Sequence, residues 1–446
     1  MRAILALLLL GGAAAPASAQ IDGHVSIVFD VLPDIDPAEG AQGAGELRAR
    51  VFAERRDQFG EHLRLNLAGY VDGLWADRHK IGASVVVRDA VARPTDAYVE
   101  FVSSRFDVRA GASRLVWGRL DEFQPTDVVN PIDLTRFILE GRGEARLAVG
   151  MVRGRLFLPH SSTLEGVIVP GFRASRFDQL DEESSPFNLV NDVGGGANDV
   201  GRGFSPAGSG GPEGPPYDRR RDEPAFGRDS IQGGARFTST FRRVDWGVAA
   251  YRGFRTFPIL TAAPTLAGRL LVTETFPRFT MIGGDFETVH GLWGVRGEVA
   301  VFPDDEMQST RAGRGVPGHG VEGGAGVDRR AGDYRIAANV LWSWRRVDSS
   351  TPAGRDFDGD DELERSDLSF VIAADRSFAR ETRTLRVLAV YDPGDATVFS
   401  RLIGAVSVRD DIWIEGSAGI FAGSSLDTIG RLTDRDFAYV RLKVFF

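Results

Sequence analysis

Strict alternation of apolar and polar side chains recurs along the chain and constrains its fold more than any other feature. In the final stretch, FAYVRLKVFF, every second residue from Ala438 to Phe446 is apolar, whereas the intervening positions include Arg441 and Lys443. Side chains alternate between the two faces of a strand, so one face of this strand is wholly apolar and the other is charged. The same alternation recurs in residues 47–54, 63–72 and 333–345.

Eighteen stretches of this kind can be placed, and the connections between them are of two kinds. Tight connections such as Arg242-Arg243 and His290-Gly291 alternate with long ones. Short turns at one end and long loops at the other are typical of bacterial outer-membrane barrels. The expected strands lie near residues 22–32, 46–56, 62–74, 95–103, 105–116, 144–157, 161–173, 230–242, 244–256, 276–288, 291–303, 321–329, 333–346, 363–378, 381–392, 397–408, 411–421 and 435–446. The long connections are residues 117–143, 174–229, 257–275, 304–320, 347–362 and 422–434.

The sequence therefore predicts an all-β fold, a closed antiparallel transmembrane β-barrel of about 16 to 18 strands, with 18 as the preferred count. The short turns would face the periplasm and the long loops the cell exterior. An even count follows if the last strand runs towards the periplasm and residues 22–32 supply a first, upward strand. Closure pairs every backbone amide where lipid offers no partner, and it removes free strand edges.

The first 19 residues have the features of a secretory signal peptide. They contain Arg2, an apolar run from Ala3 to Leu10, and the small-x-small cleavage site Ala17-Ser18-Ala19. The apolar run is too short for the alternative, a membrane anchor helix. No later window approaches ~18 uninterrupted apolar residues, so no transmembrane helix is expected. We therefore divide the chain into a signal peptide, residues 1–19, and a single barrel, residues 20–446.

Composition argues against several classes of function. A net charge of −9 disfavours a nucleic-acid partner. The absence of cysteine excludes a disulfide scaffold, a thiolate zinc site and a cysteine nucleophile. The six histidines form no spaced ligand set, and Ser161 and Ser162 beside His160 do not make a catalytic constellation. We therefore expect no enzymatic activity and no cofactor.

Three stretches together resemble an uncharacterised family of porin-like Gram-negative outer-membrane proteins. They are residues 112–137 (ASRLVWGRLDEFQPTDVVNPIDLTRF), 146–172 and 423–446. Members of that family carry a Trp-Gly pair at a strand end, then an Asp-Val-Val-Asn-Pro-x-Asp-Leu run, and end on an aromatic residue. The counterparts of this motif are Trp117, Gly118, Asp121, Asp127, Asn130, Pro131, Asp133 and Leu134.

The resemblance implies an outer-membrane location, reached by export through the inner membrane with a cleaved signal peptide. It also implies that Phe446 is part of the signal read by the barrel-assembly machinery. The expected partners are outer-membrane lipid, lipopolysaccharide, that machinery and small solutes, and a homo-oligomer is compatible with such a barrel.

The motif loop has two interpretations. It could fold into the lumen and narrow the pore, with Trp117, Asp121, Asp127, Asn130, Pro131 and Asp133 as the constriction residues. The alternative is a turn whose Asx side chains only cap the backbone. For Trp117 itself, an aromatic residue of the membrane-interface girdle is favoured over a side chain that stacks on a ligand.

Basic side chains on the polar strand faces form a second candidate site. If they face inward, the lumen is wet and basic and favours anions. Alternatively, lumenal acids such as Glu298 and Asp72 neutralise them and no selectivity results. The basic residues are Arg48, Arg50, Arg64, Arg109, Arg236, Arg296, Arg335, Arg345, Arg441 and Lys443.

An acidic run supplies one weak metal candidate, in which Asp356, Asp358 and Asp360 present oxygens at alternate positions. The EF-hand pattern fails there, because Asp361 stands where glycine is needed and Asp367 where a bidentate Glu is usual. A solvated acidic outer loop is the preferred interpretation.

The function expected from these features is a porin-like channel for the passive diffusion of small polar or anionic solutes, with the loop at residues 117–143 and part of 174–229 setting its aperture. The alternative is a plugged or structural barrel that acts as an adhesin or as a sheath for a partner protein. A soluble secreted β-sandwich is a third hypothesis, and fractionation would distinguish it from a barrel, which stays with the outer membranes.

The signal-peptide prediction is tested by the N-terminus of the exported protein. We expect outer-membrane preparations to yield a chain that begins at Gln20, because the cleavage site ends at Ala19. Mass spectrometry of the intact protein measures this directly. A protein that retains residues 1–19 in the membrane fraction would contradict it.

Overall fold

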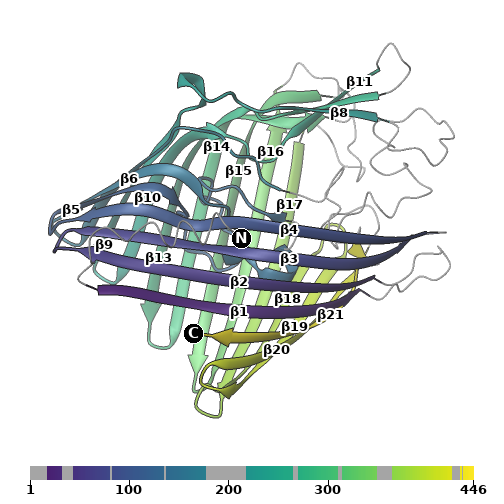
Figure 1. Cartoon of the computed structure of the whole chain (residues 1–446). Coiled ribbons are helices and arrows are strands. Elements are labelled where there is room, and N and C mark those ends of the chain that lie inside the picture. The colour runs from purple at the N-terminus through teal and green to yellow at the C-terminus, as the bar shows by residue number, and fades with distance from the viewer. Residues whose placement is uncertain are drawn as a thin grey trace.

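The computed structural model of the chain describes residues 18–32, 44–80, 83–134, 137–176, 217–264, 270–309, 314–348, 364–423, 432–433 and 435–446. Its main element is an antiparallel sheet of 18 strands that closes on itself (Figure 1). The expected fold class and preferred strand count are therefore confirmed. The strands are β1 (Ser18–Leu32), β2 (Ala44–Phe59), β3 (Leu63–Lys80), β4 (Ala83–Val102), β5 (Phe106–Ser113), β6 (Val149–Leu158), β7 (Ser162–Val169), β9 (Gln232–Phe241), β10 (Val244–Phe254), β13 (Arg278–His290), β14 (Trp293–Ser309), β15 (Arg314–Ala331), β16 (Tyr334–Val347), β17 (Glu364–Phe378), β18 (Arg383–Asp392), β19 (Thr397–Arg409), β20 (Ile412–Ala422) and β21 (Phe437–Phe445).

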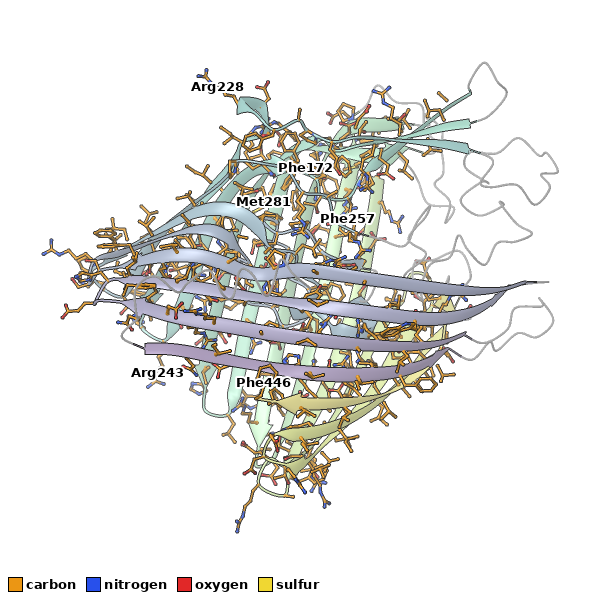
Figure 2. The ribbon with its side chains drawn as sticks, viewed as in Figure 1. Phe172, Arg228, Arg243, Phe257, Met281 and Phe446 are labelled. Atoms are coloured by element: carbon orange, nitrogen blue, oxygen red, sulfur yellow. The ribbon has the colours of Figure 1, made fainter. Side chains whose placement is uncertain are left out.

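The first and last strands form the seam that closes the barrel. β1 pairs antiparallel with β21, from His24 opposite Phe445 to Val31 opposite Ala438. Two further backbone hydrogen bonds of 3.0 Å join Gly23 and Phe446 beyond the last strand residue. A Cβ on Gly23 would lie 2.5 Å from the Phe446 ring, so this position has no space for a side chain. Phe446 lies beside β1 in Figure 2.

The alternation of side chains seen in the sequence separates an outward face of the barrel from an inward face. On β21, Val440 is 58% exposed, whereas Tyr439 on the opposite face is 3% exposed. On β2, Leu47 and Val51 are exposed and Arg48 is buried. The outward face is apolar, as lipid requires, and the inward face carries the charged side chains. Among the described residues, none of the helices is long and apolar enough to cross a membrane.

A second, three-stranded sheet was not predicted from the sequence. β11 (Ile259–Pro264) pairs antiparallel with β12 (Leu270–Thr275), which pairs parallel with β8 (Tyr217–Asp222). Figure 1 shows this sheet at the end of the barrel near β14 and β15. These strands fall within the stretches expected to be loops, residues 174–229 and 257–275. Residues 177–216 lie outside the described chain.

Several barrel strands are longer than expected. β3 and β4 extend to Lys80 and from Ala83, so most of the expected gap at residues 75–94 is strand. β14 extends to Ser309 and β15 begins at Arg314, so the long loop expected at residues 304–320 is wrong. A strand needs only about 9–11 residues to cross a bilayer. The extra residues continue the strand ladder beyond that span.

The orientation of β21 can be tested with single cysteines, because the chain has no cysteine of its own. We expect Leu442→Cys to react with a maleimide dissolved in the bilayer, since Leu442 lies on the exposed face. Lys443→Cys should react instead with a small water-soluble thiosulfonate, because it faces the lumen. The reverse pattern of labelling, read by mass spectrometry, would contradict the register.

Candidate functional site

The candidate functional site is the connection between β5 and β6, here named the lumenal segment (residues 114–134 and 137–148). It includes the short helices α2 (Phe137–Glu140) and α3 (Arg142–Ala145). Its residues contact inward-facing side chains of β7, β10 and β14 in one direction and of β1, β19 and β21 in the other. The segment therefore crosses the space that a barrel of this size would otherwise leave open.

Asn130 joins the two ends of the lumenal segment. Its Oδ1 accepts a hydrogen bond from the backbone N–H of Leu115 at 2.7 Å, and its Nδ2 donates to the carbonyls of Ser113 (3.1 Å) and Leu147 (2.8 Å). The carbonyl of Pro131 accepts from the N–H of Leu147 at 2.8 Å. Asn130 is buried, so these bonds replace contacts with water that burial removes. For Asn130 and Pro131 the structure therefore matches the capping alternative.

Trp117 anchors the first part of the segment to the inner wall. Its indole is 1% exposed, and Nε1 donates to Oε1 of Glu165 on β7 at 2.7 Å. Its ring meets Tyr251 of β10 edge to face, with the ring centroids 6.1 Å apart. The expectation that Trp117 belongs to the interface girdle is wrong, because the ring faces into the barrel. The surrounding apolar cluster includes Leu115, Val129, Met151, Phe279, Met281 and Phe302.

Glu298 of β14 holds the turn that follows Trp117. Its carboxylate accepts hydrogen bonds from the backbone N–H groups of Arg119 (2.9 Å), Leu120 (3.3 Å) and Thr126 (2.8 Å), and from the Thr126 hydroxyl (2.7 Å). Glu298 is 5% exposed, and a buried carboxylate is stable only when such donors replace water. Gly118 has a φ of +94°, and a Cβ there would lie 2.5 Å from both carboxylate oxygens. This position therefore requires glycine.

Ion pairs hold the tip of the lumenal segment. Arg119, Asp121 and Glu122 each face side chains of opposite charge on the wall, and these wall residues lie on β13, β14, β16 and β18. The tip therefore contacts a wide arc of the barrel. The pairs are Arg119 with Asp285 (2.7 Å) and Glu287 (3.2 Å), Asp121 with Arg335 (2.9 Å) and Arg296, and Glu122 with Arg386.

The helical part of the segment contacts the opposite side of the ring. Leu139 of α2 is 2% exposed and belongs to an apolar cluster with Val28 of β1 and Phe437 of β21. Arg401 of β19 donates to the backbone carbonyl of Leu139 at 3.1 Å and to the Tyr439 hydroxyl at 2.7 Å. Attachment on this side is therefore by apolar packing, by hydrogen bonds to the backbone, and by an ion pair of Glu144 with Arg50 of β2 at 3.4 Å.

The three expected constriction carboxylates are all in ion pairs. Asp127 is buried and pairs with Arg146 of the same segment at 2.5 Å. Asp133 pairs with Arg176 at 3.0 Å and also with Arg93. The Asp121 side chain is 27% exposed, which makes it the most accessible of the three. Asp127 and Asp133 thus stabilise the segment, whereas Asp121 also faces the lumen.

Most of the expected lumenal arginines have an acidic partner. This arrangement corresponds to the alternative in which acids neutralise them. Two residues of the set are described apart from the ion pairs. Arg48 is buried, and the ammonium of Lys443 lies 4.9 Å from the centroid of the Phe445 ring. The pairs are Arg50 with Asp72, Arg64 and Arg109 with Glu100, Arg236 with Asp285, Arg296 and Arg335 with Asp328, Arg345 with Glu322, and Arg441 with Glu415.

Sequence reasoning missed the residues that hold the segment in place. Glu298 was considered only as a partner for lumenal arginines, whereas its oxygens accept from the backbone turn. Arg386 and Arg401 lie on polar strand faces and could have been found from the alternation. Their contacts with the lumenal segment could not have been predicted, because the contacting residues are 264 and 262 positions apart in the sequence.

The weak metal candidate, Asp356, Asp358 and Asp360, lies outside the described residues. Within the described ranges, no group of three or more His, Cys, Asp or Glu side chains could hold a metal ion.

The closed ring and the segment across it define a porin-like β-barrel. The family described as "Protein of unknown function (DUF1302)" matches residues 76–360. This match covers more than half of the 446 residues, and the chain belongs to that family. The curated proteins contain no match to the chain.

Solved outer-membrane porin structures are similar in fold. OccAB3 of Acinetobacter baumannii has a TM-score of 0.52 at 8% identity, over 96% of this chain and 99% of that chain. The BenF-like porin from Pseudomonas fluorescens Pf-5 has a TM-score of 0.51 at 10% identity, over 97% and 99%. OccK7 (OpdD) of Pseudomonas aeruginosa has a TM-score of 0.50 at 10% identity, over 96% and 98%. At such identities the similarity concerns the fold.

The role of Glu298 can be tested by the variant Glu298→Gln. The amide replaces one acceptor oxygen with a donor that faces other donors, so we expect the free energy of unfolding to fall by about 3 kcal/mol. Urea unfolding in detergent micelles measures this change.

The matched control is Glu322→Gln on β15. Its side chain is 24% exposed and pairs with Arg345, so its loss should cost less than about 1 kcal/mol. If both variants lower the free energy of unfolding by the same amount, Glu298 does not hold the segment more strongly than a partly exposed ion pair would.

Proposed function

We propose that this protein is a porin-like channel of the outer membrane for the passive diffusion of small polar or anionic solutes. The observation that carries the proposal is the closed ring of 18 strands with an apolar outward face and a charged lumen. Barrels of this size leave an aqueous channel. The lumenal segment then sets the aperture, because it is the described connection that crosses that channel.

Solutes would meet the charged tip of the segment. The side chains of Arg335 and Arg386 are 28% and 39% exposed, and each pairs with a carboxylate of the tip. A solute carboxylate can replace Asp121 at Arg335, because Asp121 keeps its second partner, Arg296. The wall carboxylates Asp328 and Asp375 face the same arginines, so the preference for anions is weak.

The route to the membrane follows from the same proposal. Residues 1–19 direct export and are removed, and Phe446 is part of the signal for the barrel-assembly machinery. The backbone of Phe446 is hydrogen-bonded to Gly23 at the seam, which gives this residue a structural role as well. Lipopolysaccharide and lipid surround the barrel, and diffusion through it requires no catalysis.

A plugged or structural barrel is the second candidate. The attachment of the segment to opposite sides of the ring favours it, because such a segment obstructs the lumen even without further loops. The protein would then act as an adhesin or as a sheath for a partner protein.

Planar-bilayer recordings distinguish the two candidates. We expect the purified protein to conduct, and the double variant Asp121→Ala/Glu122→Ala to raise the anion-to-cation permeability ratio roughly twofold, since it removes two lumenal negative charges. The reversal potential in a salt gradient measures this ratio.

Glu381→Gln is the control, because Glu381 lies in the exposed turn between β17 and β18. Its reversal potential should equal that of the unmodified protein. A wild-type protein that shows neither conductance nor liposome swelling would support the plugged barrel.

A further inference from the structure

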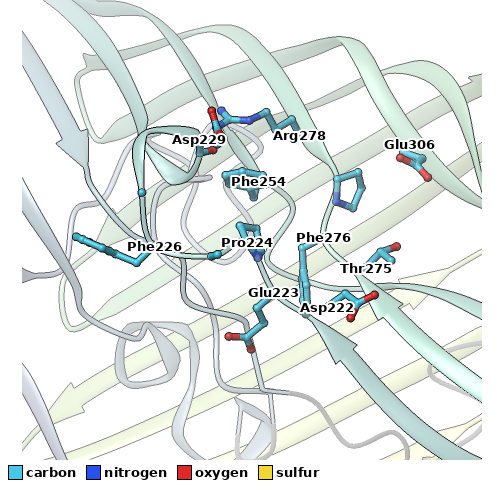
Figure 3. Close-up of a pocket in the computed structure, with 13 residues that line it drawn as sticks. Asp222, Glu223, Pro224, Phe226, Asp229, Phe254, Thr275, Phe276, Arg278 and Glu306 are labelled. Carbon is cyan, nitrogen blue, oxygen red and sulfur yellow. The ribbon is translucent and has the colours of Figure 1, made fainter.

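A cavity of about 790 Å³ lies at the end of the barrel, apart from the lumenal segment (Figure 3). It is lined by residues 222–227 and Asp229, by the end of β10, by residues 275–278 at the end of β12 and the start of β13, and by Glu306 of β14. Its volume is within the usual range for small-molecule sites, roughly 300–1,000 Å³. None of its lining residues contributes to the proposed constriction.

Aromatic rings form a packed base for this cavity. Phe254 and Phe276 line it and are 8% and 5% exposed. Phe172 packs against both, with ring centroids 5.8 Å and 4.8 Å away. Such a packed group changes shape little when a ligand enters, so less entropy is lost on binding.

The cavity wall at Gly227 and Asp229 is tied to the barrel by hydrogen bonds of neighbouring residues. The hydroxyl of Ser230 donates to the Pro170 carbonyl at 2.9 Å, and Nε2 of Gln232 donates to the Gly171 carbonyl at 2.9 Å. Arg278 donates to the backbone carbonyls of Asp229 and Ile231. The cavity therefore has a fixed wall as well as a fixed base.

The lining of the cavity carries more negative than positive charge. Four lining residues carry carboxylates, namely Asp222, Glu223, Asp229 and Glu306, and the one cationic lining residue is Arg278. Arg278 is already bonded to backbone carbonyls, and its guanidinium carbon lies 4.2 Å from the centroid of the Phe254 ring.

Two of the four carboxylates have partners outside the lining. Asp222 pairs with Arg220 at 2.7 Å, and Glu223 lies 3.7 Å from Arg221. Among the described residues, Asp229 and Glu306 have no ion-pair partner, and Arg278, which bonds to the backbone carbonyl of Asp229, is the one cation in the lining.

We infer that this cavity binds an organic cation with an apolar body, such as an alkyl- or arylammonium ion. Asp229 and Glu306 attract the positive charge, and the aromatic base receives the apolar part. An anion would face four carboxylates, and a neutral molecule would gain nothing from the charges of Asp229 and Glu306. This site is separate from diffusion through the lumen.

The test uses the full-length protein in a non-ionic detergent and calorimetric titration with benzyltrimethylammonium. Benzyl alcohol and benzoate are the neutral and anionic controls. We expect the cation to bind at least tenfold more tightly than either control. We also expect the variant Asp229→Asn/Glu306→Gln to weaken cation binding at least tenfold.

The matched control is Asp222→Asn/Glu223→Gln, which removes two carboxylates that already have partners and should weaken binding less than threefold. The shift in gel migration on heating verifies that each variant is folded. If Asp229→Asn/Glu306→Gln does not fold, the single variant Glu306→Gln replaces it in the binding measurement. Equal binding of the cation and benzyl alcohol, or unchanged affinity in folded Glu306→Gln, would overturn the inference. Loss of conductance would leave it intact, because the cavity lies outside the constriction.

Discussion

Backbone hydrogen bonding around a closed ring is the constraint on which the rest of this structure depends. A strand in lipid has no other partner for its N–H and C=O groups, so β1 must pair with β21 as well as with β2. Once the ring is closed, the register decides which side chains meet lipid. A slip of one residue on β21 would turn Arg441 outward and Val440 inward. The backbone pairing of Gly23 with Phe446 at the seam therefore helps to set the orientation of every side chain of β21.

The lumenal segment depends on that ring, because its anchors come from strands far apart in the sequence. Near Trp117 it is held by apolar packing and by the buried carboxylate of Glu298. At its tip it is held by ion pairs, and at α2 by Arg401 and an apolar cluster. Ion pairs exposed to water contribute less than buried hydrogen bonds to a charged group. The pairs of Asp121 with Arg335 and of Glu122 with Arg386 are the more exposed ones, so they hold the tip weakly, and they are also the groups that solutes would meet.

The alternation predicted the 18 barrel strands well, because lipid on one side and water on the other impose a period of two. It failed where that boundary is absent. Trp117 follows the end of β5 at Ser113, so its orientation no longer follows the strand period, and it was wrongly assigned to the girdle. The sheet of β8, β11 and β12 was missed because β8 and β12 pair across about fifty positions that include the barrel strands β9 and β10. For the motif carboxylates, residue type suggested a pore lining, but Asp127 pairs with Arg146 within the segment, and Asp133 pairs with Arg93 and Arg176 from outside it.

The sequence by itself determined which face of each strand is apolar and where the motif loop lies, and it limited the number of strands to between 16 and 18. These properties are local, since a residue and its immediate neighbours are enough to specify them. Only the tertiary structure decided that the loop crosses the lumen, that Glu298 accepts from its backbone, and that most lumenal arginines are paired with acids. These properties depend on which strands become neighbours when the ring closes, and the charge of a side chain alone does not specify its partner.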